Sequence, residues 1–170
     1  MADFNMNIDL TTLLLLALLA IAVIGLISIK NRTSVPPSKD AQTLPMRLQA
    51  YERLILLSER ISLPHLISRL NNPSASVDEM KALLIETIKQ EFDYNSTQQL
   101  YVSATAWESV RNLKEQTILL INQVAASLGG QSTGSMLNKK LLEIRLSEQG
   151  KPLEDVVKAV LNEEAKRLMR

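Results

Sequence analysis

His65 is the side chain best suited to acid–base chemistry in this sequence, because an imidazole titrates near neutrality. It is the only histidine in the chain, and it directly follows a proline. A nucleophilic site would pair it with a serine or cysteine, but the chain has no cysteine and we identify no serine partner. Polar residues at a helix start are common for structural reasons. We therefore predict that His65 is not catalytic and that the protein is not an enzyme.

Glu86, Glu91 and Asp93 are carboxylates close enough in sequence to suggest a metal site. They are not accompanied by a Glu-x-x-His pair or by a calcium-loop pattern, so we expect a solvated helix face. No Gly-x-x-x-x-Gly-Lys phosphate loop is present, and a chain without cysteine has no disulfide and no thiolate metal ligand. The sequence thus predicts no catalytic residue, no metal, no cofactor and no small-molecule substrate.

The composition favours helices and argues against nucleic-acid binding. Lys and Arg number 19, and Asp and Glu number 18, whereas a dedicated nucleic-acid surface usually has a strong basic excess. Glycines and aromatic residues are few, while Leu, Ile, Glu, Lys and Gln are abundant. We therefore predict an all-α fold with no nucleic-acid partner.

Residues 10–29 form a predominantly apolar run that no charged side chain interrupts. At about 1.5 Å per residue, a helix of this length reaches roughly 30 Å, the thickness of the hydrocarbon core of a bilayer. A cleaved signal peptide is a poorer fit, because the leader carries Asp3 and Asp9 but no Lys or Arg, and because the run is too long. The run predicts a single transmembrane helix that anchors the chain in the lipid bilayer.

The charges beside this run predict the orientation of the chain. Lys30, Arg32, Lys39 and Arg47 follow the run, whereas only acidic residues precede it. Because basic flanks remain in the cytoplasm, residues 1–9 are expected outside and the C-terminal domain inside. The expected location is the bacterial inner (plasma) membrane, with a single pass.

Residues 30–44 are predicted to be a linker, since Pro36 and Pro37 prevent the membrane helix from continuing. A helical bundle is expected over residues 45–128. Ser76 and Glu79 form a capping box, and Ser103 caps the longest helix. The helices expected in the bundle cover residues 45–61, 64–70, 77–92 and 104–128.

Two runs of four apolar residues are expected at the centre of this bundle. They are residues 54–57 and 118–121, and each covers more than one face of its helix. We predict that both runs are buried on two sides and that they pack against each other. Lys114 and Thr117 interrupt the apolar seam of the longest helix, which argues against a plain coiled coil.

Residues 129–135 are predicted to be a second, Gly/Ser-rich linker, and residues 136–170 a C-terminal helix pair. The expected helices are 136–148 and 152–168, and the second carries an apolar stripe into which Glu164 intrudes. Glu154 with Lys158 and Glu163 with Arg167 have the spacing of ion pairs within a helix. Whether this pair packs on the bundle or projects from it stays open at this level.

The candidate partner interface combines that apolar stripe with two aromatic residues. Large aromatic side chains often anchor protein interfaces, but they are equally suited to a core. The candidate interface residues are Tyr101, Trp107, Leu153, Val156, Val157, Val160, Leu161 and Leu168.

Several short motifs of the bundle resemble an uncharacterised bacterial family of single-span, membrane-anchored helical proteins. The motifs are 48–54 (LQAYERL), 98–103 (QQLYVS), 106–107 (AW), 114–115 (KE) and 121–122 (IN). The resemblance covers roughly residues 44–128. It implies an N-terminal membrane span and a helical region, and it implies no activity, cofactor or binding residue.

The anchor, the linkers and the helical bundle together lead to two hypotheses of function. The first is a non-enzymatic, membrane-tethered helical adaptor or accessory subunit of a membrane-associated protein complex. A tether raises the local concentration of the domain near membrane partners, so that weak contacts suffice. The alternative is a self-associating structural membrane protein, a homo-oligomeric scaffold.

Overall fold

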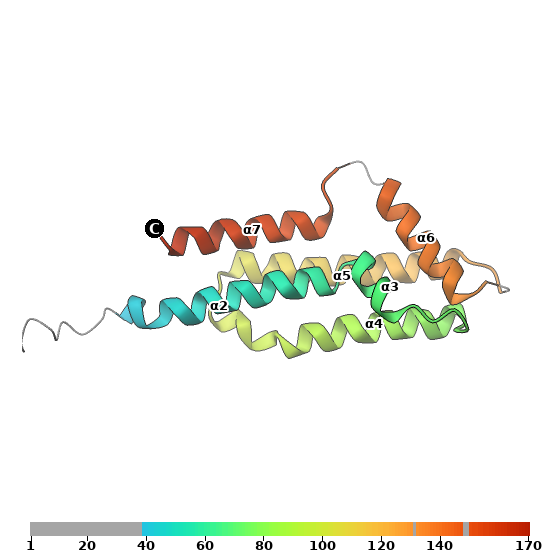
Figure 1. The fold of residues 1–170 in the computed structure, drawn as a ribbon, viewed down its shortest axis with the longest axis horizontal. Helices are drawn as coiled ribbons and strands as arrows, with labels where there is room; N and C mark the ends of the chain where they lie inside the picture. The colour runs from blue at the N-terminus through green and yellow to red at the C-terminus, as the bar shows by residue number, and fades with distance from the viewer. Residues whose placement is uncertain (1–38, 131, 148–149) are drawn as a thin grey trace, which may run out of the picture. The chain divides into compact units, whose positions relative to one another are not determined.

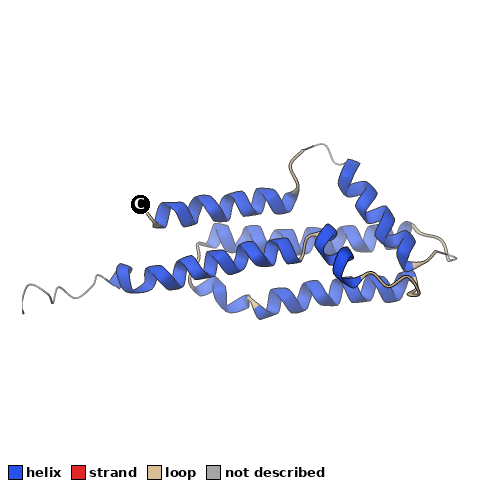
Figure 2. Cartoon of the chain, viewed as in Figure 1, coloured by secondary structure: helices blue, strands red, loops and turns tan. Residues whose placement is uncertain are grey.

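The computed structural model describes residues 39–130, 132–147 and 150–170. Every regular element in these ranges is a helix (Figure 2). The predicted all-α fold is therefore confirmed for the described part of the chain. The elements are α2 (Lys39–Arg60), α3 (Leu63–Leu70), α4 (Val77–Tyr94), the short 3-10 helix η1 (Ser96–Leu100), α5 (Ala104–Ser127), α6 (Gly134–Ser147) and α7 (Leu153–Leu168).

The chain divides into residues Met1–Gln42 and a compact unit, Thr43–Arg170. The predicted N-terminal segment 1–9, the predicted membrane span 10–29 and residues 30–38 of the predicted linker lie outside the described residues. Among the helices that the structure does describe, none is both long and apolar enough to cross a membrane.

Within Thr43–Arg170, the long helices α2, α4, α5 and α7 lie side by side, and their directions alternate along the chain (Figure 1). Helix α5 packs against α4 and α7, and α6 crosses one end, where it contacts α3, α4 and α5. This is the up-down-up-down order of a four-helix bundle. All six α-helices contribute to one core, with fully buried side chains such as Leu54, Leu66, Leu84, Val110, Leu141 and Leu161.

Helix α2 begins earlier than the sequence predicted. It starts at Lys39 and contains Pro45 in its interior, so residues 39–44 of the predicted linker are helical. A proline at this position forgoes only one helical hydrogen bond, the one to the carbonyl of Ala41. Because that loss falls near the N-terminus of the helix, the good helix formers before Pro45 can extend it.

The predicted helix caps are confirmed. The Ser76 hydroxyl accepts a hydrogen bond from the Glu79 backbone N–H at 3.3 Å, and the Glu79 carboxylate accepts one from the Ser76 backbone N–H at 2.8 Å. Ser103 Oγ accepts from the Ala106 N–H at 2.9 Å at the start of α5. Each of these bonds provides an acceptor for a backbone N–H group at the start of a helix, where no carbonyl of the same helix can accept it.

The two apolar runs are less buried than predicted. Leu54 and Leu57 are buried, but Leu56 is 53 % exposed, and Ile121 is buried while Leu119 is 48 % exposed. The prediction of burial on two sides was therefore wrong for both runs. A helix turns by about 100° per residue, so four consecutive positions cover its whole circumference and one of them faces away from the core.

The predicted linker 129–135 ends as a tightly packed segment. Gly134 is the first residue of α6, it is buried, and its N–H donates to the Ala75 carbonyl at 2.8 Å. Thr133 and Ser76 form an isolated antiparallel bridge beside this bond. Residues 134 and 135 therefore belong to the bundle, because a glycine without a side chain allows the two backbones to approach.

Replacing Gly134 with alanine is expected to lower the free energy of unfolding by about 1–3 kcal/mol, the usual cost of overpacking. The added Cβ would lie 2.8 Å from Met80 Cβ and 3.0 Å from the Ala75 carbonyl oxygen. The effect can be measured by urea unfolding, followed through the fluorescence of Trp107, the only tryptophan. Gly130→Ala is the control, because no atom lies within 4 Å of its Cβ. Equal stability of the two variants would contradict the packing described here.

A polar contact links three of the long helices. The Tyr51 hydroxyl on α2 donates to Glu164 Oε2 on α7 at 2.7 Å and accepts from the backbone N–H of Ser103, at the start of α5, at 3.2 Å. Burial raises the pKa of the Tyr51 phenol, and the bond to Glu164 raises it further. The acidic residue that interrupts the apolar stripe of α7 is thus the partner of a buried tyrosine.

Candidate interaction surface

The C-terminal helix pair packs on the bundle, which answers the question that the sequence left open. Val157 and Leu161 of α7 are 3 % and 0 % exposed and belong to the common core. Both were predicted as interface residues, but within this chain they face α5 and the core. Leu168 and Val160 are half-buried, whereas Leu153 and Val156 are 39 % and 44 % exposed. Only the last two remain as an open part of the stripe.

The two aromatic candidates are both half-buried. The Trp107 ring lies 5.0 Å from the Phe92 ring, centroid to centroid, and the Lys114 ammonium lies 4.3 Å from the centroid of Phe92. Trp107 packs against the core at the α4–α5 contact. It therefore serves the packing of this chain, and Lys114 interrupts the apolar seam because it stacks on an aromatic ring.

His65 has a hydroxyl neighbour that the sequence analysis missed. Ser62 Oγ lies 3.0 Å from His65 Nδ1, and Glu59 Oε1 lies 3.6 Å from His65 Nε2. A serine three residues before a histidine at a helix start is the signal that could have revealed the pair. The order of the three side chains resembles a nucleophile, a base and an acid.

The hydrogen bonds run against such a role. The Ser62 hydroxyl donates to the Glu59 backbone carbonyl at 2.8 Å, so the imidazole is left to donate to the serine oxygen. A general base must instead accept the proton of its nucleophile. The contact satisfies a carbonyl in the last turn of α2, which is a structural role.

The three carboxylates considered for a metal site do not share one partner. Glu91 is bound by two arginines, Arg60 of α2 and Arg69 of α3, while Glu86 accepts from Gln90 on its own helix. The bond from Arg60 lowers the pKa of the Glu91 carboxyl, with a smaller contribution from Arg69. Glu91 therefore joins α2, α3 and α4 as a fixed anion.

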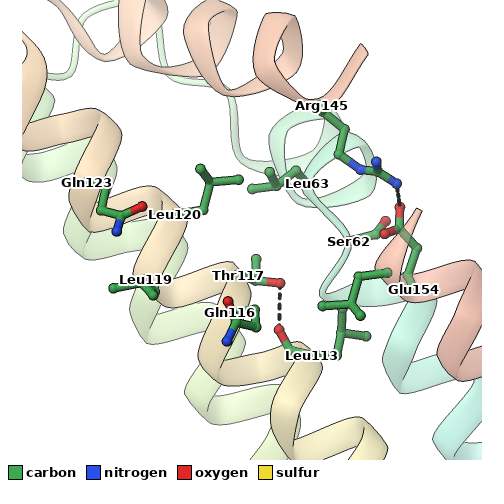
Figure 3. A pocket seen from close by; sticks show the side chains of 11 residues that line it. Ser62, Leu63, Leu113, Gln116, Thr117, Leu119, Leu120, Gln123, Arg145 and Glu154 are labelled. Carbon is green, nitrogen blue, oxygen red and sulfur yellow. Dashed lines mark hydrogen bonds and ion pairs between the residues drawn. The ribbon is translucent and has the colours of Figure 1, made fainter. Parts of the chain in front are cut away.

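A pocket of about 220 Å³ lies where α5 and the start of α7 meet the α2–α3 junction. Figure 3 shows Gln116, Leu119, Leu120 and Gln123 of α5 on one side and Arg145 reaching Glu154 on the other. Thr117 also lines it, but its hydroxyl donates to the Leu113 carbonyl at 2.8 Å within α5. The volume is below that of a typical small-molecule site.

Arg145 of α6 and Glu154 of α7 form an ion pair at 2.8 Å in the wall of this pocket. Their side chains are 12 % and 13 % exposed. The predicted pair of Glu154 with Lys158 is not formed, because Lys158 binds Asp155 at 2.8 Å instead. The predicted pair of Glu163 with Arg167 is present at 3.4 Å.

Exposed apolar side chains border the pocket. Leu119 on α5 and Leu153 on α7 both line it, and Val156 follows one turn after Leu153. The three residues are between 39 % and 48 % exposed. We refer to Leu119, Leu153 and Val156 as the α5–α7 rim. The rim combines two helices that lie far apart in the sequence, and Ser62, the hydroxyl neighbour of His65, also lines the pocket beside it.

The chain is similar to one known family over almost its whole length. The family model for a family of unknown function, DUF7935, matches residues 6–168. The match is longer than the resemblance recognised in the sequence, and it includes α6 and α7. No curated protein and no solved structure matches the chain. Because the family model covers far more than half of the chain, the protein belongs to DUF7935, a family of unknown function.

Proposed function

We propose that this protein is a non-enzymatic, membrane-tethered helical adaptor or accessory subunit of a membrane-associated protein complex. Residues 10–29 would hold it in the bacterial inner membrane, with the helical unit on the cytoplasmic side. The observation that carries the proposal is the α5–α7 rim, where Leu119 and Leu153 line a pocket and Val156 lies exposed one turn after Leu153.

The α5–α7 rim has the composition of a docking surface. Interface energy concentrates in apolar anchors that fill a pocket with a polar border. Here Leu119 and Leu153 line a pocket of about 220 Å³, which suits one partner side chain, and Gln116 and Gln123 supply polar groups beside them. A partner that filled the pocket would cover apolar surface that the bundle itself leaves in water.

Several polar groups of the pocket already have hydrogen-bond or ion-pair partners within the chain, which favours binding over catalysis. Arg145 and Glu154 form their ion pair, and Thr117 donates within its own helix. His65, the only histidine of the sequence, does not line the pocket. An apolar surface whose polar groups have partners within the chain is suited to bind a partner of complementary shape rather than to catalyse a reaction.

The test is a crosslinking pull-down from intact membranes with a variant that removes the apolar rim, Leu119→Gln with Val156→Gln. The variant is expected to capture at least about tenfold less of the protein partner, since truncation of a hot-spot side chain costs about 2 kcal/mol or more. The control is Leu146→Gln on α6, where the side chain is 87 % exposed. It should retain the partner.

Two results would overturn the proposal. A partner captured equally by the rim variant, the control and the unchanged protein would show that the rim is not the docking surface. Crosslinks of the protein only to itself, in all three forms, would favour the homo-oligomeric scaffold instead of an adaptor.

A further inference from the structure

Helix α2 has one face that the bundle does not cover. On one side, α2 contacts α7 through the hydrogen bond of Tyr51 with Glu164. On the other side, it contacts α4 through the bond of Arg60 with Glu91. Leu56 points away from the core between these two contacts and is 53 % exposed. A leucine that lies in water in the middle of a long helix gains free energy when another surface covers it.

A hollow of about 550 Å³ lies beside Leu56, between α2 and α4. Arg53 and Thr87 line it together with Tyr94, whose side chain is 75 % exposed. Leu56 and Tyr94 are therefore two large exposed side chains, from two helices, at the borders of one hollow. The hollow leaves room for a side chain of a partner next to Leu56.

Charged residues surround Leu56 in a regular arrangement. Two glutamates, Glu52 and Glu59, lie four residues before it and three residues after it. Two arginines, Arg53 and Arg60, lie three residues before it and four residues after it. Because a helix turns by about 100° per residue, both glutamates fall on one side of Leu56 and both arginines on the other. We refer to these five residues, an acidic edge and a basic edge with a leucine between them, as the α2 face.

Two charges of the α2 face lack an ion-pair partner in the part of the chain that the structure describes. They are Glu52 and Arg53, which do not face each other because they are adjacent in the helix. In contrast, Arg60 binds Glu91, and Glu59 lies 3.6 Å from Nε2 of the only histidine. A surface that places an arginine opposite Glu52 and a glutamate opposite Arg53 would complement both charges.

We infer that a second copy of this chain docks on the α2 face, with the two α2 helices parallel and Leu56 against Leu56. A rotation by 180° about an axis parallel to α2 keeps the height of every residue and exchanges the two edges. The acidic edge of each copy then meets the basic edge of the other. Glu52 lies opposite Arg53 of the second copy, about 1.5 Å apart in height, and this pair forms twice because the interface is two-fold symmetric.

An antiparallel dimer would not have this complementarity. It reverses the height of each residue without exchanging the edges, so that glutamates would face glutamates and arginines would face arginines. Like charges opposite each other disfavour an interface, and the charge pattern therefore selects the parallel arrangement. The α2 face shares no residue with the α5–α7 rim, so the inference does not depend on the proposed adaptor function.

A single cysteine tests the position of the contact in the full chain, which contains no other cysteine. Leu56→Cys is oxidised with copper phenanthroline in nonionic detergent. It is expected to give about tenfold more disulfide-linked dimer than Leu119→Cys, because a disulfide requires two Cα atoms within about 7 Å. Leu119 is the matched control, since it is 48 % exposed on another helix. Equal yields of dimer from the two variants would overturn the inference.

A second position distinguishes the parallel from the antiparallel dimer. Gln49 is exposed and lies two turns before Leu56, on the same line along α2. In the parallel dimer, Gln49→Cys faces its own copy and is expected to form the disulfide. In an antiparallel dimer centred on Leu56, it would face Leu63 instead. Disulfide formation by Leu56→Cys but not by Gln49→Cys would therefore overturn the parallel arrangement.

An exchange of charges tests the recognition itself. Glu52→Arg places like charges opposite each other twice, and it is expected to raise the dissociation constant of the dimer about tenfold or more. Glu52→Arg combined with Arg53→Glu exchanges the two charges and is expected to restore the dimer. Sedimentation velocity of the full chain in nonionic detergent measures both. The helix retains its own contacts in these variants, because neither residue has an ion pair among the described residues.

Two outcomes of the sedimentation experiment would overturn the inference. One is an unsubstituted chain that stays monomeric at about 50 μM, where a dimer of micromolar affinity would be assembled. The other is a double variant that dimerises as weakly as Glu52→Arg alone. The rim variant, Leu119→Gln with Val156→Gln, should dimerise like the unsubstituted chain, so that loss of a rim partner and loss of the dimer are separate results.

Discussion

Replacing Leu161 with alanine is expected to lower the free energy of unfolding by about 2–5 kcal/mol. Leu161 lies on α7 with an exposed fraction of 0 %, and it belongs to the core that all six α-helices share. The loss combines the apolar transfer free energy of the removed atoms with the cavity that they leave. Urea unfolding in detergent, followed by Trp107 fluorescence, measures it.

The control for this prediction lies on the same helix. Val156→Ala removes apolar atoms from a side chain that is 44 % exposed, so we expect a change within about 0.5–1 kcal/mol. If Leu161→Ala were as mild as Val156→Ala, α7 would not be part of the core. The whole stripe would then be available to a partner, as the sequence alone suggested.

Replacing Arg145 with methionine is expected to lower the free energy of unfolding by about 3 kcal/mol. The change leaves the Glu154 carboxylate, which is 13 % exposed, without its arginine. Removal of one member of a largely buried pair costs about 3–5 kcal/mol, because the remaining charge loses its partner and is only partly hydrated. The pair is not fully buried, so the lower part of that range applies.

Two further variants separate this effect from simple packing. Arg145→Met combined with Glu154→Leu should recover most of the loss, since no unpaired charge remains. Arg111→Met removes an ion pair to Glu108 whose side chains are 52 % and 44 % exposed, and it should change stability by less than about 1 kcal/mol. A double variant no more stable than Arg145→Met would contradict an unpaired charge as the cause.

The sequence by itself determined the features that depend on neighbours within one or two turns. The all-α fold follows from composition and apolar periodicity, and the caps at Ser76 and Ser103 follow from residues three positions apart. The Glu163–Arg167 pair is of the same kind. These interactions form within one helix or at its end, so their geometry follows from helix geometry alone.

The contact between Ser62 and His65 shows that the sequence does not determine the role of every local contact. Their spacing was visible in the sequence, but its meaning depended on the direction of one hydrogen bond to the Glu59 carbonyl. Residue type and spacing suggest chemistry, whereas the donor–acceptor pattern decides whether it can occur.

The tertiary structure alone decided how the helices meet. Tyr51 is hydrogen-bonded to Glu164, 113 residues away in the sequence. Glu154 pairs with Arg145 of another helix instead of with Lys158, its expected partner. The backbone of Gly134 is hydrogen-bonded to that of Ala75. Periodicity identifies an apolar stripe but not the element that covers it. Val157 and Leu161 are therefore buried by α5 and the core while Leu153 and Val156 remain exposed. The reason is physical, since burial depends on the position of every other helix, and no local pattern contains that information.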